Sequence, residues 1–202
     1  MVHKFMKGEL AGKAKKYMTW EQLESNCREC RRCGLAYGRT NVVIGRGCKT
    51  APVMIVGEGP GQKEDETGLP FVGRAGELLD LALESLGFSE NDYYIANIVK
   101  CRPENNRTPT EDECEKCLPY LRAQFALIRP KIIVCLGNVA TKAMIDKSFQ
   151  VSKARGIWYT KNGTLFLATY HPAALLRDES KKIEMWEDLR KVKIRLYEGL
   201  DT

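Results

Sequence analysis

Long hydrophobic runs are absent from this sequence. No apolar stretch approaches the ~20 residues that a membrane-spanning helix requires, so we expect no membrane association. The basic N-terminal segment is not followed by the apolar stretch of a secretory signal, which favours the cytoplasm. Internal repeats and low-complexity segments are also absent. We therefore expect a basic arm at residues 1–18 and a single domain at residues 19–202.

The common nucleotide-binding motifs are also missing, although a glycine-rich loop invites the comparison. The apolar run Val53–Val56 predicts a buried parallel strand. Three glycines follow it within five residues: Gly57, Gly59 and Gly61. A dinucleotide fingerprint would need glycine at Gln62, and Gly61–Glu64 lacks the Gly-Lys-Ser/Thr of a Walker loop. The loop remains a pocket candidate because ligands bind beyond strand ends in open α/β sheets; the alternative is a turn without a ligand.

Strand patterns alternate with helical patterns along the rest of the chain. The further strand candidates are residues 92–100, 131–137 and 165–170, and Asn162-Gly163 predicts a hairpin turn. The helix candidates are residues 19–32, 74–86, 110–128, a short segment from 138, and 179–197. Thr19 and Thr110 each begin a capping-box pattern. This alternation predicts an α/β domain with a parallel sheet flanked by helices on both faces.

Eight cysteines are unexpected in a chain without a secretory signal, and they indicate metal or redox chemistry rather than disulfides. Cys30 and Cys33 form a close pair, and Cys101 and Cys117 are distant single residues. Four thiolates in such an arrangement could enclose a tetrahedral zinc ion or a cubane iron–sulfur cluster. Spacing does not decide between these two.

Spacing also does not fix which cysteines are ligands. Cys27 lies three residues before Cys30, and Cys114 lies three residues before Cys117, so both have ligand spacing. Cys135 lies inside a predicted strand and is expected to be a buried apolar residue. Cys48 has no partner by spacing, and we expect it to be unliganded.

Five motifs in a fixed order resemble the uracil-DNA glycosylases, and in particular their thermostable, iron–sulfur-containing family 4. The motifs are Gly57-Glu58-Gly59-Pro60-Gly61, Glu64-Asp65, Phe71–Gly76, Asn97–Pro103 and Tyr170-His171-Pro172. The resemblance extends over about residues 19–195. It implies a four-stranded parallel sheet between helices and a [4Fe–4S] cluster. The cluster ligands it implies are Cys30, Cys33, Cys101 and Cys117.

The resemblance also implies roles in base recognition and bond breakage. A glycosylase must extrude the target nucleotide before it can reach the glycosidic bond. Phe71 would stack on the uracil, and Asn97 has the donor and acceptor needed for uracil N3–H and O4. His171 would donate a hydrogen bond to O2 of the departing uracil anion. The loop residues Gly57, Gly59, Pro60 and Gly61 would line the base pocket.

The group that activates the attacking water is left open. The best-known branch of the superfamily has an aspartate where this chain has Gly59, so that activator is missing. Glu58, Glu64 and Asn106 are the candidates. Glu64 has a second possible role, since it could block the space beside uracil C5 and so exclude thymine.

DNA contacts are expected on the loop after His171 and on the helix that begins near Arg74. Leu175 is the closest match to an intercalating wedge, with Leu176 as the alternative, and Arg177 follows them. The net charge of +6 is compatible with a polyanionic partner. The expected partner is uracil-containing DNA, single- or double-stranded, bound by a monomer that would be nucleoid-associated. Replication or repair proteins are further possible partners.

Two other function classes fit parts of the pattern. A non-catalytic iron–sulfur or zinc DNA-binding module would use the same loops, and it is favoured by the missing aspartate. A thiol redox protein would use the paired cysteines, but the distant Cys101 and Cys117 argue against it. An assay for release of free uracil would distinguish a hydrolase from both of these alternatives.

Overall fold

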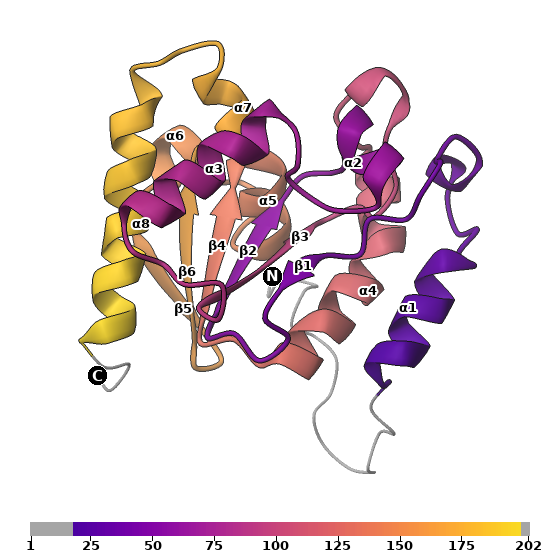
Figure 1. The fold of residues 1–202 in the computed structure, drawn as a ribbon, viewed down its shortest axis with the longest axis horizontal. Helices are drawn as coiled ribbons and strands as arrows, with labels where there is room; N and C mark the ends of the chain where they lie inside the picture. Colours follow the sequence, from indigo (N-terminus) through magenta and orange to yellow (C-terminus); the bar gives the residue numbers. More distant parts are fainter. Residues whose placement is uncertain (1–17, 199–202) are drawn as a thin grey trace.

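The computed structural model describes residues 18–198, so most of the predicted basic arm lies outside the described residues. The domain contains one six-stranded sheet in the order β1-β3-β2-β4-β6-β5 (Figure 1). The strands are β1 (Arg46–Gly47), β2 (Val53–Gly57), β3 (Tyr93–Asn97), β4 (Ile132–Leu136), β5 (Trp158–Lys161) and β6 (Thr164–Thr169). In the described part of the chain, no helix is long and apolar enough to cross a membrane.

The four central strands are parallel and are buried on both faces. Every residue of β2 and β4 is buried, and so is every residue of β3 except Tyr93, as the continuous apolar runs predict. Met54 and Val56 pack into the core on one face, while Val53 and Ile55 pack into the core on the other. This alternation follows from the two-residue period of a strand. Because of it, the four residues Val53–Val56 pack against the helices on both faces of the sheet.

The prediction of a four-stranded parallel sheet was therefore incomplete, because the sheet has six strands and is mixed. β1 pairs with β3 and β5 pairs with β6, both in the antiparallel direction. β5 and β6 form the predicted hairpin, with positive φ at Asn162 and Gly163. β1 has only two residues, so no periodicity in the sequence reveals it.

Helices cover both faces of the sheet (Figure 1). One core contains residues from α1 (Trp20–Arg28), α4 (Glu111–Ile128), α5 (Gly137–Met144) and α6 (Val151–Ala154). The opposite core contains residues from α3 (Arg74–Ser85), α7 (Pro172–Leu175) and α8 (Lys181–Tyr197). The remaining short elements are η1 (Gly34–Tyr37), α2 (Gln62–Thr67) and η2 (Glu104–Asn106). Both predicted capping boxes are confirmed, at Thr19 and at Thr110.

Helix α1 ends at Arg28, earlier than predicted, so Cys30 and Cys33 lie beyond it in the following loop. In α8, the apolar residues spaced at helical intervals along one face are only partly buried. Leu189 and Val192 are in the core, but Ile183 is 68% exposed and Trp186 is 39% exposed. Residues Met185 and Asp188 are buried instead.

Candidate active site and cysteine site

A pocket of about 380 Å³ lies at the carboxyl ends of the parallel strands, where ligands bind in open α/β sheets. Its walls come from the loop after β2, the end of β3, the loop before α4 and the segment after β6. The predicted site residues that line it are Glu58, Gly59, Pro60, Gly61, Glu64, Phe71, Asn97, Asn106, His171 and Arg177. Segments that are far apart in the sequence thus form one site.

Gly57 does not line the pocket but makes room for two residues that do. A Cβ at position 57 would lie 2.4 Å from Oδ1 of Asn97 and 2.5 Å from Cζ of Phe71. Only glycine permits this close approach. Asn97 is 2% exposed, and its Oδ1 has no hydrogen-bond partner among the described residues. A buried amide oxygen without a partner is costly, so this atom is suited to accept a hydrogen bond from a ligand.

Phe71 is held in an unusual backbone conformation, with φ of 55°. Arg46 supports it from β1, donating to the carbonyl oxygens of Pro70 and Phe71 at 2.9 and 3.4 Å. The same guanidinium pairs with Asp80 on α3. The Phe71 ring lies 5.6 Å from the His171 ring, with an interplanar angle of 32°. The strain is located at a pocket residue, as is common at functional sites.

His171 is fixed in a specific tautomer. The backbone N–H of Ala173 donates to Nδ1 of His171 at 3.2 Å, so in the neutral ring the proton is on Nε2. Burial, together with the nearby Arg177, lowers the pKa of His171 to about 4, although Glu64 opposes the shift. Gly137 provides the space behind the ring, since a Cβ there would lie 2.9 Å from the His171 Cβ. At neutral pH, His171 is thus an uncharged donor.

The Glu64 carboxylate is engaged by the backbone on both sides of the pocket. It accepts hydrogen bonds from the N–H groups of Gly61 (3.0 Å), Val72 (3.0 Å) and Gly73 (2.9 Å). These bonds join the glycine loop to the N-terminus of α3, where a negative charge is favourable. The arrangement gives Glu64 a positioning role that the sequence did not reveal.

Glu58 is the less constrained carboxylate. Burial raises the pKa of Glu58, and a hydrogen bond with the Thr108 side chain partly offsets the shift. Asn106 faces the same pocket from η2, with its Oδ1 accepting from Nε of Arg102 at 2.8 Å. A desolvated carboxylate in a pocket is suited to accept a proton from water.

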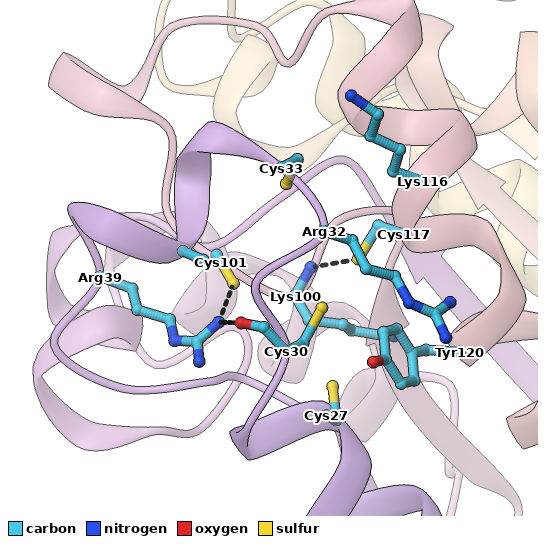
Figure 2. Close-up of a pocket in the computed structure, with 11 residues that line it drawn as sticks. Cys27, Cys30, Arg32, Cys33, Arg39, Lys100, Cys101, Lys116, Cys117 and Tyr120 are labelled. Carbon is cyan, nitrogen blue, oxygen red and sulfur yellow. Dashed lines mark hydrogen bonds between the residues drawn. The ribbon is translucent and has the colours of Figure 1, made fainter.

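A second, smaller pocket is lined by cysteine sulfurs (Figure 2). The cysteines are Cys27, Cys30, Cys33, Cys101 and Cys117, and the cationic residues that line it are Arg32, Arg39, Lys100 and Lys116. Among residues 18–198, no carboxylate lines this pocket. Arg39 donates to Sγ of Cys101 at 3.1 Å, and the backbone N–H of Lys100 donates to Sγ of Cys117 at 3.2 Å. Four cations and two such donors suit a negatively charged thiolate-bound group.

The structure separates some of the alternative ligands. Cys114 lines a different pocket, between α4 and α5, Cys135 is fully buried in β4, and Cys48 contacts the Thr50 hydroxyl. Cys27, by contrast, remains beside the four predicted ligands. Among the described residues, no three Cys, His, Asp or Glu side chains are gathered closely enough to hold a single metal ion.

The buried thiols are poor nucleophiles. Burial raises the pKa of Cys27 and of Cys117 to about 12, and thiol reactivity depends on the thiolate. A bound metal would displace these protons. The cysteine pocket is therefore better suited to hold a metal group than to perform thiol–disulfide exchange.

Sequence comparison relates the chain to known proteins. The sequence model of the uracil DNA glycosylase superfamily matches residues 44–190. The chain belongs to this superfamily. It is 43% identical over 179 residues to the Type-4 uracil-DNA glycosylase of Thermotoga maritima, covering 86% of this chain and 92% of that protein. It is 47% identical over 175 residues to the Type-4 enzyme of Saccharolobus solfataricus, covering 82% and 81%. A third Type-4 enzyme, from Sulfurisphaera tokodaii, is 42% identical over 182 residues, covering 86% and 83%.

The four residues predicted to contact DNA differ in exposure and in their distance from the pocket. Arg177 lines the pocket and is exposed, whereas Arg74 is exposed at the start of α3 but does not line it. Leu175 is 1% exposed and packs in the core, so it cannot enter a base stack without leaving that core. Leu176 is 41% exposed. Of the two wedge candidates, Leu176 is therefore the one with its side chain on the surface.

Several residues that shape this glycosylase site were missed from the sequence. Arg46, Gly137 and Lys100 act through contacts with residues distant in the chain. Thr108 was missed because a lone threonine in a polar loop carries no pattern. A glycine at the end of a predicted buried strand was the signal that the sequence offered for Gly137, whose φ in the structure is 82°.

Proposed function

We propose that the protein is a uracil-DNA glycosylase of the Type-4 kind, which flips deoxyuridine out of DNA and hydrolyses its N-glycosidic bond. The products would be free uracil and an abasic site. The observation that carries the proposal is the meeting of Phe71, Asn97 and neutral His171 in one pocket. Membership in the superfamily and identity to Type-4 enzymes over most of the chain support the same reaction.

Base recognition falls to Phe71 and Asn97. The Phe71 ring would stack on the flipped base, and Asn97 would bond its Watson–Crick edge. The free Oδ1 of Asn97 supports this role, because it can accept from uracil N3–H while the amide N–H₂ donates to O4. Cytosine presents the opposite pattern at both positions, so the same amide would disfavour it.

Bond breakage requires stabilisation of the departing base. As the C1′–N1 bond breaks, its electron pair moves to uracil, and negative charge develops at O2. The Nε2–H of His171 would donate to O2 there. The low pKa of His171, about 4, is consistent with hydrogen-bond donation by a neutral ring rather than transfer of a proton.

Water activation is assigned to Glu58, with Asn106 helping to position the water. The pocket-lining carboxylate of Glu58 would accept one water proton as the oxygen bonds to C1′. The departed uracil anion would take up a proton from solvent, and Glu58 would return its proton to solvent, which completes the hydrolysis. Glu64 is a weaker candidate, because three backbone N–H groups already occupy its carboxylate. We assign Glu64 to holding the loop that carries Phe71.

The cysteine pocket is proposed to hold a [4Fe–4S] cluster on Cys30, Cys33, Cys101 and Cys117. The cationic lining and the donors to Cys101 and Cys117 support a negatively charged group there. When bound, such a cluster would tie the loop after α1 to the segment after β3 and to α4. Iron, rather than zinc, is what resemblance to the family implies.

DNA binding is proposed to use Leu176 as the wedge, with Arg177 and Arg74 at the phosphates. A monomer acting on uracil-containing DNA, single- or double-stranded, in the cytoplasm fits this arrangement, and replication or repair proteins would be its further partners. Phosphate contacts by Arg and Lys would make the affinity strongly dependent on salt.

One assay tests the central claim. Purified protein is incubated with an oligonucleotide that contains one deoxyuridine, and free uracil is measured together with alkali-sensitive abasic sites. The matched thymidine and deoxycytidine oligonucleotides serve as controls. Release of uracil alone is expected. DNA binding without any base release would instead favour the non-catalytic module.

A further inference from the structure

Lys100 is a buried cation with no carboxylate partner. Its side chain is 0% exposed, and within residues 18–198 no Asp or Glu lies within ion-pair distance of its ammonium group. Burying an unpaired ammonium group is expensive. A residue in this state needs a compensating negative charge nearby.

The contacts of Lys100 connect two sites. Its Nζ donates to the backbone carbonyl of Asn97 at 2.8 Å and to Oε1 of Gln124 at 2.6 Å. Its backbone N–H donates to Sγ of Cys117, and it also lines the cysteine pocket (Figure 2). Asn97, on the other side, lines the base pocket.

Gln124 fixes the far end of this network. It is fully buried in α4, and its Nε2 donates to the carbonyl of Ile44 at 2.8 Å and to the Tyr94 hydroxyl at 3.2 Å. The Lys100 ammonium is thus held between α4 and the end of β3. Of the described groups that line the cysteine pocket with it, the thiols and the Tyr120 hydroxyl can become anionic. The Tyr120 hydroxyl donates to the carbonyl of Asn26 and burial raises its pKa, so the negative charge must come from the cysteines.

We propose that Lys100 is a positioning residue that couples the thiolate-bound group to the recognition of uracil. The negative charge of the loaded cysteine site stabilises the ammonium group, and the ammonium in turn holds the Asn97 carbonyl, so that the Asn97 side chain faces the base. The effect of Lys100 on uracil recognition, the uracil half of the inference, rests on the proposed function. The interaction between Lys100 and the loaded cysteine site, the cysteine half, does not depend on it.

The test compares Lys100→Met, which keeps the length of the side chain but removes its charge and donors, with wild type. Single-turnover uracil release is measured over a range of substrate concentrations, and the reduction potential of the bound cluster is measured separately. The variant should require about tenfold more substrate for half-maximal rate, the loss typical of one charge-assisted hydrogen bond. The maximal rate should change less, and the potential should become more negative because a nearby cation is lost.

Lys161→Met is the matched control. Lys161 Nζ also donates to backbone carbonyls, those of Met144 and Ile145, but it lines neither pocket. This variant should retain the substrate dependence and the potential of wild type. If Lys100→Met behaved like Lys161→Met in both measurements, the coupling would be refuted.

A second variant covers the case in which Lys100→Met does not fold. Gln124→Met keeps the charge on Lys100 but removes one of its acceptors. It should raise the half-saturating substrate concentration several-fold with little change in the potential, and an unchanged value would overturn the proposal. If wild type released no uracil, the proposed function would fail, and the potential of Lys100→Met would still decide the cysteine half.

Discussion

Replacement of His171 by alanine gives the sharpest test of the assigned chemistry. The Ala173 N–H at Nδ1 leaves the single ring proton on Nε2, so the substitution removes one preorganised donor from the base pocket. Loss of such a donor typically lowers the rate by roughly 10²–10³, equivalent to ~2.7–4 kcal/mol of transition-state stabilisation. We expect that loss in the single-turnover rate of uracil release.

The pH dependence separates a neutral donor from a cationic one. With a pKa of about 4, His171 stays almost entirely neutral down to roughly pH 5.5, whereas an ordinary histidine would be about 90% protonated there. Protonation of His171 therefore should not change the rate between pH 5.5 and 8. A wild-type rate that followed a group titrating near pH 6.5, and lost that dependence in His171→Ala, would contradict the neutral-donor assignment.

Two further variants control the interpretation. His3→Ala changes the other histidine, which lies outside the described residues, and should have the wild-type rate. Gly137→Ala leaves the imidazole in place but forces a Cβ to within 2.9 Å of the His171 Cβ, at a φ of 82° that disfavours alanine. It should lower both the rate and the stability. A wild-type single-turnover rate for folded His171→Ala would refute the central role of this residue.

The remaining predictions concern water, the wedge and the metal. Glu58→Gln should slow single-turnover release by about 10²–10⁴ with little change in substrate affinity. It should also remove the acid limb of the wild-type pH profile, which falls as pH drops through the raised pKa of Glu58. Leu176→Ala should weaken action on duplex more than on single-stranded substrate, whereas Leu175→Ala should mainly lower the free energy of unfolding, by about 2–5 kcal/mol. Cys27→Ala should retain about four irons per chain by chemical analysis, as for a cubane cluster, whereas Cys101→Ala should lose them.

Each of these measurements has an outcome that would contradict its assignment. Equal losses on both substrates would remove Leu176 as the wedge, and an unchanged acid limb in Glu58→Gln would move water activation elsewhere. Colourless wild-type protein with one zinc ion would exclude the cluster but preserve the four-cysteine site.

Local patterns were sufficient for the central strands and for the capped starts of α1 and α4, whereas the short helices α2, α6 and α7 were not predicted. The run Val53–Val56 is apolar throughout because both faces of the strand are covered, and Thr110 caps α4 through its own neighbour Glu113. Such features depend on residues close in sequence. The two edge strands were not counted in the predicted sheet, since β1 is too short for a period to show and β5 was expected only as one arm of a hairpin.

Features set by distant contacts could not be predicted in the same way. Asp188 looks like a solvent-facing residue of α8, yet it is buried, where it pairs with Arg155 and accepts from the Thr169 hydroxyl. That interaction turns Met185 and Asp188 inward and leaves Ile183 exposed. The burial of Leu175 was also beyond local patterns, because it depends on α3 and α8 rather than on its own loop.

Two adjacent carboxylates of α2 organise the backbone around the pocket. Glu64 binds the backbone N–H groups that link the glycine loop to the Phe71 segment. Asp65, one residue later and 3% exposed, binds the N–H groups of Thr40 and Asn41. Helix α2 therefore joins the base pocket to the segment that also carries Arg39 of the cysteine site. Such backbone bonds preorganise polar groups before substrate arrives, which is the condition under which a single donor such as His171 can lower the barrier substantially.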